Sequence, residues 1–263
     1  MTFVPRHPGS IELGVPRSSR YHWLIMALSR FLKHYGDPVR LTIICALVVP
    51  LTLTIVTGRS AYAQSTDDSL RVHAVHIVQD PPQSWTGYGI YLGNGLVITA
   101  AHVVGRVNRT KPSVRIAGLD LPARAVKEGR FERIDLTLLA FDDDKLPVSI
   151  RMRRMPVCEH APWVGEPVIV VIPEGTARSY VMSPWLIPRN SRTRFSTVIR
   201  DVATTGNSGS GVIDDHRKCL LGIMSRKIQV RSSSKPDSPP VDIAKYFVPA
   251  STIRAFLPTE YRH

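Results

Sequence analysis

The part of the sequence best suited to chemistry is residues 204–211, which read Thr-Thr-Gly-Asn-Ser-Gly-Ser-Gly. Glycines surround Ser208 in this run, and glycine tolerates positive φ angles and the close approach of other groups. Such a loop can present a serine hydroxyl beside backbone N–H groups that point the same way. A nucleophilic serine with an oxyanion hole needs that arrangement. Taken alone, a run rich in Gly and Ser also fits an ordinary surface turn.

Two segments upstream could complete a catalytic serine centre. His102 ends the sequence Thr-Ala-Ala-His, directly after the apolar run 96–98. Asp135 begins the sequence Asp-Leu-Thr-Leu-Leu, at the mouth of another apolar run. A serine hydroxyl is a weak nucleophile at neutral pH, and a histidine base oriented by an aspartate is one way to activate it. The sequence therefore offers His102, Asp135 and Ser208 as a catalytic triad.

Other candidate residues fit this chemistry less well. His73 and His76 would fall on opposite faces of a strand because their spacing is odd, and neither follows a pair of alanines. Cys158 and His160 lie close together, as metal ligands often do, but no second ligand pair follows at zinc spacing. No metal site and no cofactor are therefore predicted.

The three segments together resemble the signatures of the trypsin/chymotrypsin clan of serine proteases, in the order His, Asp, Ser. The resemblance covers roughly residues 70–258. The form Gly-Asn-Ser-Gly-Ser after two threonines is most similar to the bacterial secreted branch, which includes the glutamyl endopeptidases. The resemblance implies that His102 is the general base, that Asp135 orients it and that Ser208 forms the acyl-enzyme. It also implies an oxyanion hole made by the backbone N–H groups of Gly206 and Ser208.

The same resemblance places a substrate pocket beside the serine. The residues implied to line it are Val202, Thr204, Thr205, Ser225, Arg226 and Lys227. Val202 stands where a trypsin-like enzyme has the aspartate that selects Arg or Lys, so that specificity is not expected. Met224 stands where glutamyl endopeptidases have a histidine, so their marker is absent as well. Arg226 or Lys227 could still attract an acidic side chain before the scissile bond, and this preference stays open.

An all-β body has to position these residues. The chain contains 21 prolines and 17 glycines, which divide it into short segments typical of strands and turns. With the resemblance, this pattern predicts two six-stranded antiparallel β-barrels, a first barrel at 70–141 and a second at 151–248. A linker at 142–150 joins them, and a short C-terminal helix is expected at 249–257.

The expected strands follow from runs of apolar and β-branched residues. In the first barrel they are 71–79, 87–92, 96–99, 114–116, 122–126 and 134–141. In the second barrel they are 167–172, 180–186, 195–201, 211–213, 220–225 and 241–248. Asn94 and Gly95 form a dipeptide that predicts a two-residue hairpin turn between the second and third strands.

Residues 1–63 are typical of a targeting segment that precedes the protease domain at 64–263. A basic stretch, the apolar run 41–56 and a small-X-small sequence ending at Ala63 indicate a signal peptide, and a membrane anchor is the alternative. Translation could begin at Met1 or at Met26. The expected location is the periplasm or the medium, or else the inner membrane if residues 41–57 remain as an anchor.

The cysteines and the net charge indicate whether a disulfide forms and which partners the chain binds. Cys158 and Cys219 form an even pair in an exported domain, which predicts a disulfide, with two buried thiols as the alternative. The formal net charge of +13 would allow contact with nucleic acids, but the arginines are scattered and no nucleic-acid-binding motif accompanies them. The expected partner is a polypeptide substrate, the expected state is a monomer, and residues 41–57 would contact a membrane if they are not removed.

Two functions are compatible with the sequence. The first is an exported serine endopeptidase. The second is an inactive or latent protease-fold protein that binds its partner at the membrane or in the periplasm. Arg226 and Lys227 keep the second function open because they replace the small residues expected in the pocket.

Overall fold

The computed structural model describes residues 67–80, 87–105, 110–200, 208–231 and 239–261. All of them lie in the second of two compact units into which the chain divides, Tyr62–His263. The predicted signal segment and its cleavage site after Ala63 lie outside the described residues. No helix in the described part of the chain has both the length and the apolar character needed to span a membrane.

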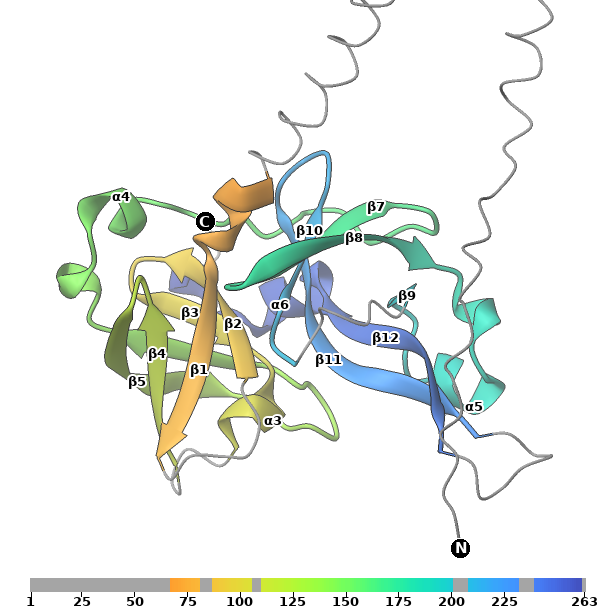
Figure 1. The fold of residues 1–263 in the computed structure, drawn as a ribbon. Coiled ribbons are helices and arrows are strands. Elements are labelled where there is room, and N and C mark those ends of the chain that lie inside the picture. The colour runs from red at the N-terminus through yellow and green to blue at the C-terminus, as the bar shows by residue number, and fades with distance from the viewer. Residues whose placement is uncertain (1–66, 81–86, 106–109, 201–207, 232–238, 262–263) are drawn as a thin grey trace, which may run out of the picture. The chain divides into compact units, whose positions relative to one another are not determined.

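The first six strands close into an antiparallel barrel in the order β1-β2-β3-β6-β5-β4, coloured orange to green in Figure 1. These strands are β1 (Ala74–Asp80), β2 (Gly87–Gly93), β3 (Leu96–Thr99), β4 (Lys111–Ile116), β5 (Leu119–Glu128) and β6 (Thr137–Phe141). Strand β4 alternates between buried Val114 and Ile116 and exposed Arg115, so one of its faces lies on the barrel interior. Asn94 and Gly95 have φ angles of 53° and 68° between β2 and β3, which confirms the predicted hairpin turn.

The remaining strands form a second closed antiparallel barrel, in the order β10-β11-β12-β9-β8-β7. These strands are β7 (Pro167–Ile172), β8 (Gly175–Met182), β9 (Val198–Arg200), β10 (Gly211–Asp214), β11 (Leu220–Val230) and β12 (Val241–Pro249). The pairing of β11 with β12 changes register between Met224 and Arg226, which makes Ser225 the extra residue of a bulge. A bulge redirects a side chain locally, and bulges are common beside functional sites.

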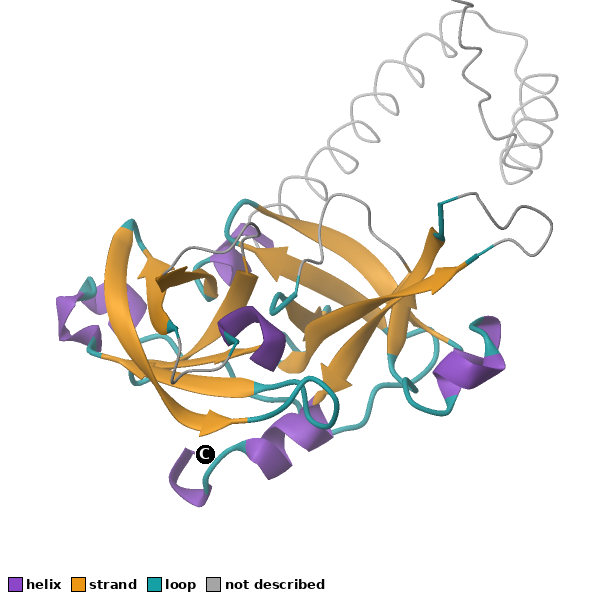
Figure 2. Cartoon of the chain, turned by 90° about the horizontal axis from the view of Figure 1, so that it is seen from below, coloured by secondary structure: helices purple, strands orange, loops and turns teal. Residues whose placement is uncertain are grey.

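One hydrophobic core runs through both barrels. It contains buried residues of the first barrel such as Ile90 and Leu138, and of the second such as Ile169 and Leu220. Helix α6 (Ala250–Phe256) adds Ile253 to the same core and packs on β11 and β12. Figure 2 shows this helix outside the strands, next to the C-terminus. Because the apolar contacts are continuous, the barrels are fixed against each other.

The structure confirms the predicted fold and corrects several strand boundaries. Strand β6 begins at Thr137 instead of residue 134, because residues 129–136 close a loop in which Gly129 N donates to Leu136 O. Strand β8 is shifted toward the N-terminus of the expected range 180–186. It stops at Met182 because Ser183 caps a 3₁₀ helix, η2 (Pro184–Leu186).

Short helices occupy most of the other connections. They are α3 (Ala101–Val104), η1 (Asp143–Lys145), α4 (Val148–Arg151), α5 (Arg189–Arg192) and η3 (Thr259–Tyr261). The predicted linker at 142–150 thus contains η1 and most of α4. Helix α3 follows β3 after a single residue and carries His102, so the rim of the first barrel holds the histidine in place.

Candidate active site

The histidine and the aspartate of the predicted triad are joined by two hydrogen bonds. His102 Nδ1 donates to Asp135 Oδ2 at 2.8 Å, and the backbone N–H of His102 donates to Asp135 Oδ1 at 3.0 Å. Because the carboxylate can only accept, the proton of a neutral imidazole lies on Nδ1. The other ring nitrogen, Nε2, then carries a lone pair and can act as a general base.

Asp135 is buried, with 2 % of its surface exposed, and it accepts a third hydrogen bond. Ser225 Oγ donates to Asp135 Oδ2 at 2.6 Å from the bulge in β11, so the second barrel supports the aspartate of the first. Burial opposes ionisation, but the hydrogen bonds from His102 and Ser225 outweigh it and hold the pKa of Asp135 below its usual value. The carboxylate is therefore ionised beside the imidazole at neutral pH.

Ser208 is linked to the same residues through Ser225. Its hydroxyl donates to the backbone carbonyl of Ser225 at 3.3 Å, and among the hydrogen bonds of the described residues none joins Ser208 to His102. Its own carbonyl accepts from Tyr88 N, on β2 of the first barrel, at 3.0 Å. Ser208 is thus linked to the Asp135–His102 pair through Ser225, which uses its carbonyl oxygen for Ser208 and its hydroxyl for Asp135.

Gly209 shows why the serine loop needs glycine. Its φ angle is +88°, and its N–H donates to Met224 O at 2.8 Å. A Cβ atom at this position would stand 1.9 Å from the carbonyl oxygen of Tyr88. No other residue type can occupy this position without moving the loop that carries Ser208.

Arg226 and Lys227, predicted to line the pocket, both have partners in the structure. The Arg226 guanidinium lies 3.9 Å from the ring centre of Phe131 and 5.0 Å from that of Phe195. Its Nη2 donates to Phe131 O at 2.7 Å, so this side chain connects the two barrels. Burial lowers the pKa of the guanidinium from its usual value. Lys227 Nζ binds the carboxylate of Asp242.

The rest of the predicted pocket and half of the predicted oxyanion hole lie outside the described residues. These residues are Val202, Thr204, Thr205 and Gly206. Ser225, also predicted to line the pocket, is 1 % exposed, and its hydroxyl supports Asp135. Only its backbone carbonyl reaches Ser208.

The two other histidines considered from the sequence make different contacts. His73 Nδ1 interacts with Tyr91 O at 3.0 Å, and burial lowers the pKa of its imidazole. His76 Nε2 lies 3.1 Å from Glu174 Oε1. Neither histidine contacts Ser208 or Asp135 in the described structure. Their contacts are therefore those of structural residues, and neither takes the place of His102 beside the serine.

Sequence reasoning missed two residues near the site. The Phe131 ring packs edge-on against the imidazole of His102, with ring centres 5.1 Å apart, although it lies in a loop with no periodic pattern. The side-chain role of Ser225 was also missed. A small hydroxyl residue at the end of the apolar run 220–224 was the one available indication of it.

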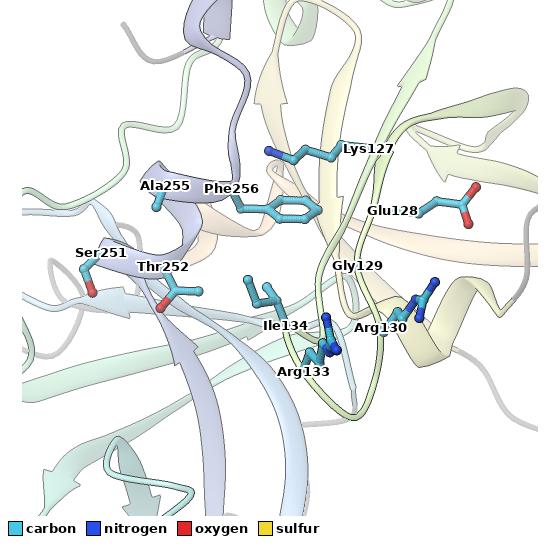
Figure 3. Close-up of a pocket in the computed structure, with 10 residues that line it drawn as sticks. All are labelled: Lys127, Glu128, Gly129, Arg130, Arg133, Ile134, Ser251, Thr252, Ala255 and Phe256. Carbon is cyan, nitrogen blue, oxygen red and sulfur yellow. The ribbon is translucent and has the colours of Figure 1, made fainter.

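Two pockets adjoin the loop that leads to Asp135. One of about 780 Å³ is lined by His102, Phe131 and neighbouring residues, and lies beside the imidazole. The other, of about 640 Å³, lies between residues 127–134 and helix α6 (Figure 3). Figure 3 shows Lys127, Arg130 and Arg133 around this second pocket, which none of the predicted triad residues lines.

The predicted disulfide is present in the second barrel. Cys158 and Cys219 are bonded, with their Cα atoms 5.1 Å apart. The bridge ties the segment that precedes β7 to the turn between β10 and β11.

Comparison with known proteins agrees with this geometry. The model of the family described as "Trypsin-like peptidase domain" matches residues 87–223. No protein with a curated description matches the sequence.

Among solved structures, the chain is similar to the Rv3671c protease of M. tuberculosis in its inactive form, with a TM-score of 0.52 and 16 % identity over 72 % of this chain and 89 % of that one. It is also similar to kallikrein-related peptidase 10, with a TM-score of 0.50 and 15 % identity over 70 % of this chain and 93 % of that one. At these identities the likeness concerns the fold. The glutamyl endopeptidase branch stays a prediction.

Proposed function

The chain belongs to the family of trypsin-like peptidase domains, and from this premise we propose that it is a serine endopeptidase that cleaves peptide bonds through an acyl-enzyme on Ser208. No cofactor takes part in the proposed reaction. Ser208 supplies the nucleophile, His102 the base, and Asp135 the negative charge that stabilises the imidazolium.

In the proposed mechanism, the Ser208 hydroxyl first leaves its acceptor, the carbonyl of Ser225, and turns to His102 Nε2. His102 takes the proton as Ser208 Oγ attacks the substrate carbonyl, and later gives it to the leaving amine. Asp135 holds the proton on Nδ1 and stabilises the imidazolium. Water then takes the place of the amine: His102 accepts a proton from the water as it attacks the acyl-enzyme, and returns that proton to Ser208 as the product acid leaves. The N–H groups of Gly206 and Ser208 are proposed to bind the oxyanion, each contributing about 3–4 kcal/mol.

One observation carries this proposal: four residues from distant parts of the sequence share a single hydrogen-bond network. Its links are Ser208 to Ser225, Ser225 to Asp135, and Asp135 to His102. Two closed barrels are needed to bring these residues together. A buried carboxylate bound to a histidine beside a glycine-flanked serine is the arrangement that serine proteases use.

Fluorophosphonate labelling of the purified full chain tests the proposal. We expect labelling of the wild type, and its loss in Ser208→Ala and in His102→Ala. Ser210→Ala is the matched control, since it removes a hydroxyl two residues away in the same glycine-rich loop, and it should still be labelled. Labelling that survives in Ser208→Ala, or is absent from folded wild type, would contradict the proposed mechanism.

A latent protease-fold binding protein is the second candidate, and two contacts favour it. Ser208 donates to the Ser225 carbonyl instead of to His102, and Arg226 crosses from the second barrel to Phe131 beside the histidine. Both contacts would have to open before a substrate could react. Folded wild type that is never labelled, but is labelled as Arg226→Ala, would establish the latent form.

The location and the partners are part of the proposal. We infer export to the periplasm or the medium, with a polypeptide as substrate, the monomer as the active state and no nucleic acid as partner. If residues 41–57 are retained, they anchor the chain to the inner membrane instead. The mass of the protein recovered from fractionated cells decides between cleavage after Ala63 and retention of the segment.

A further inference from the structure

Four side chains of metal-ligand type converge in the second barrel, outside the proposed catalytic network. They are Cys158, His160, Asp214 and Cys219. One ligand atom from each lies within 4.8 Å of the ligand atoms of all the others. Both cysteines and Asp214 are buried, and the imidazole is 23 % exposed. The cluster joins the segment before β7 to the end of β10 and the following turn.

Asp214 has one carboxylate oxygen that accepts hydrogen bonds and one that accepts none in the described structure. Oδ1 accepts from the backbone N–H groups of His216 at 2.8 Å and Arg217 at 3.1 Å. Oδ2 is buried and has no hydrogen-bond donor among the described residues. Two side-chain nitrogen atoms face it at longer range, His160 Nε2 at 3.5 Å and Arg217 Nη1 at 3.7 Å. A buried carboxylate oxygen without a hydrogen bond is costly, so this oxygen is suited to a cation placed closer to it.

His160 is held in the form that binds metals. Its Nε2 lies 2.7 Å from Glu166 Oε1, and its Nδ1 lies 3.1 Å from Arg217 Nη1. Arginine can only donate, so Nδ1 accepts, and the proton of a neutral ring lies on Nε2. Glu166 is fully buried and also accepts from Trp163 N at 3.0 Å, so it fixes the orientation of the ring. Carboxylates that orient a histidine in this way are common around metal sites.

A cation already lies between two members of the cluster. The Arg217 guanidinium contacts His160 Nδ1 and faces Asp214 Oδ2, although its side chain is 59 % exposed and can turn into solvent. A compact divalent cation would satisfy both groups and could add the two sulfurs as ligands. Two thiolates, one imidazole and one carboxylate form a donor set that suits tetrahedral Zn²⁺.

We propose that Cys158, Cys219, His160 and Asp214 bind Zn²⁺ when the disulfide is reduced. A dithiol reductant gives two electrons and two protons to the S–S bond, which yields two cysteine thiols, while the reductant becomes a disulfide. Zn²⁺ then displaces both thiol protons to the solvent and binds the two thiolates. The metal and the disulfide are mutually exclusive links between the same two segments.

The sequence predicts no metal site, and the reason lies in the spacing. Cys158 and His160 form one close pair, and Asp214 and Cys219 form another, but the two pairs stand 54 residues apart in the sequence. The usual zinc patterns place their two pairs much closer together and build them from cysteine and histidine. The fold places the segment before β7 beside the β10–β11 turn, where Val157 bridges to Leu220. The site is therefore visible only in three dimensions.

Co²⁺ titration tests the proposal, because Co²⁺ substitutes for Zn²⁺ and reports its ligands by absorption. The full chain is reduced with dithiothreitol, desalted without oxygen and titrated in parallel with the oxidised chain. We expect reduced protein to bind about one Co²⁺ per chain with thiolate-to-metal charge-transfer absorption, and to release it to Zn²⁺. Oxidised protein should give no such absorption.

Variants distinguish a specific four-ligand site from non-specific binding of Co²⁺ by the two thiols. His160→Ala and Asp214→Asn should each weaken Co²⁺ binding roughly tenfold or more. The asparagine retains an oxygen that can accept the backbone bonds of the turn. His216→Ala is the matched control, because its side chain is not in the cluster, and it should bind like the wild type. If reduction unfolds the chain, Zn²⁺ should restore its circular dichroism.

Three results would overturn the proposal. They are a reduced, folded wild type without charge-transfer absorption, affinities of His160→Ala and Asp214→Asn equal to that of the wild type, and a reduced, unfolded chain that Zn²⁺ does not restore. None of these outcomes depends on labelling of Ser208, so the metal site and the proposed protease activity stand or fall separately.

Discussion

Replacing Ser225 by alanine removes the hydrogen bond through which the second barrel supports Asp135. The Ser225 hydroxyl lies 2.6 Å from a carboxylate that is 2 % exposed. Water has little access to replace the lost donor at this depth. His102 retains both of its bonds to the carboxylate in the variant. Besides the bond to Asp135, the variant loses the long hydrogen bond that Arg226 Nε donates to Ser225 Oγ at 3.4 Å.

The expected loss of stability depends on pH. A hydrogen bond to a charged group contributes about 1.5–3 kcal/mol, so the free energy of unfolding of Ser225→Ala should fall by that amount near neutral pH. The folded-state pKa of Asp135 lies below its unfolded value, so its ionisation stabilises the fold above the unfolded pKa. This stabilisation is lost as the pH falls through the folded pKa. The variant raises that folded pKa, so its difference from wild type should shrink on acidification.

Urea denaturation of both proteins from about pH 3 to about pH 7 measures this difference. Ser210→Ala serves as the control, because it removes a buried serine hydroxyl from the neighbouring loop, and its effect should not follow the titration of Asp135. A difference between Ser225→Ala and wild type that is the same at both ends of the pH range would refute the assigned role of Ser225.

Four further substitutions have defined expectations. Gly209→Ala should lower the rate of fluorophosphonate labelling of Ser208 about 100-fold, because the added Cβ would meet the carbonyl oxygen of Tyr88 and displace the loop. Labelling at the wild-type rate would contradict this steric argument. Arg226→Ala should lower the free energy of unfolding by about 1–2 kcal/mol through loss of its aromatic contacts. Lys227→Ala, which removes an exposed ion pair, should cost less than about 0.5 kcal/mol in the same urea titration; equal losses would argue against the aromatic contacts. Cys158→Ser should lower the free energy of unfolding by about 4 kcal/mol, because the bridge spans 61 residues. This loss should vanish when both proteins are measured under reducing conditions in the absence of zinc.

Local sequence patterns predicted the features that depend on neighbouring residues. The turn at Asn94 and Gly95 follows from the two positive φ angles that such a turn requires. His102, Asp135 and Ser208 were each placed by a short motif, and the structure joins them through a common network. The two barrels were implied by the resemblance that these motifs carry.

Features that depend on closure of the barrels were beyond the sequence. Arg226 contacts Phe131 across 95 residues, so this contact could not be predicted from the neighbours of Arg226 in the sequence. The start of β6 was placed too early because Ile134 belongs to the apolar run by composition but to the loop by hydrogen bonding. The partners of Ser225 follow from a bulge, and no residue pattern specifies where a bulge will occur.

The bond from Tyr88 to Ser208 has a consequence for the time at which the site appears during synthesis. The first barrel supplies His102, Asp135 and the N–H group of Tyr88, whereas Ser208 and Ser225 come later in the chain. A chain emerging from the ribosome therefore contains the proposed base, His102, before it contains the proposed nucleophile, Ser208. The network closes only after residue 225 has been made and both barrels have docked. The proposed protease activity therefore requires that the second barrel has already been synthesised.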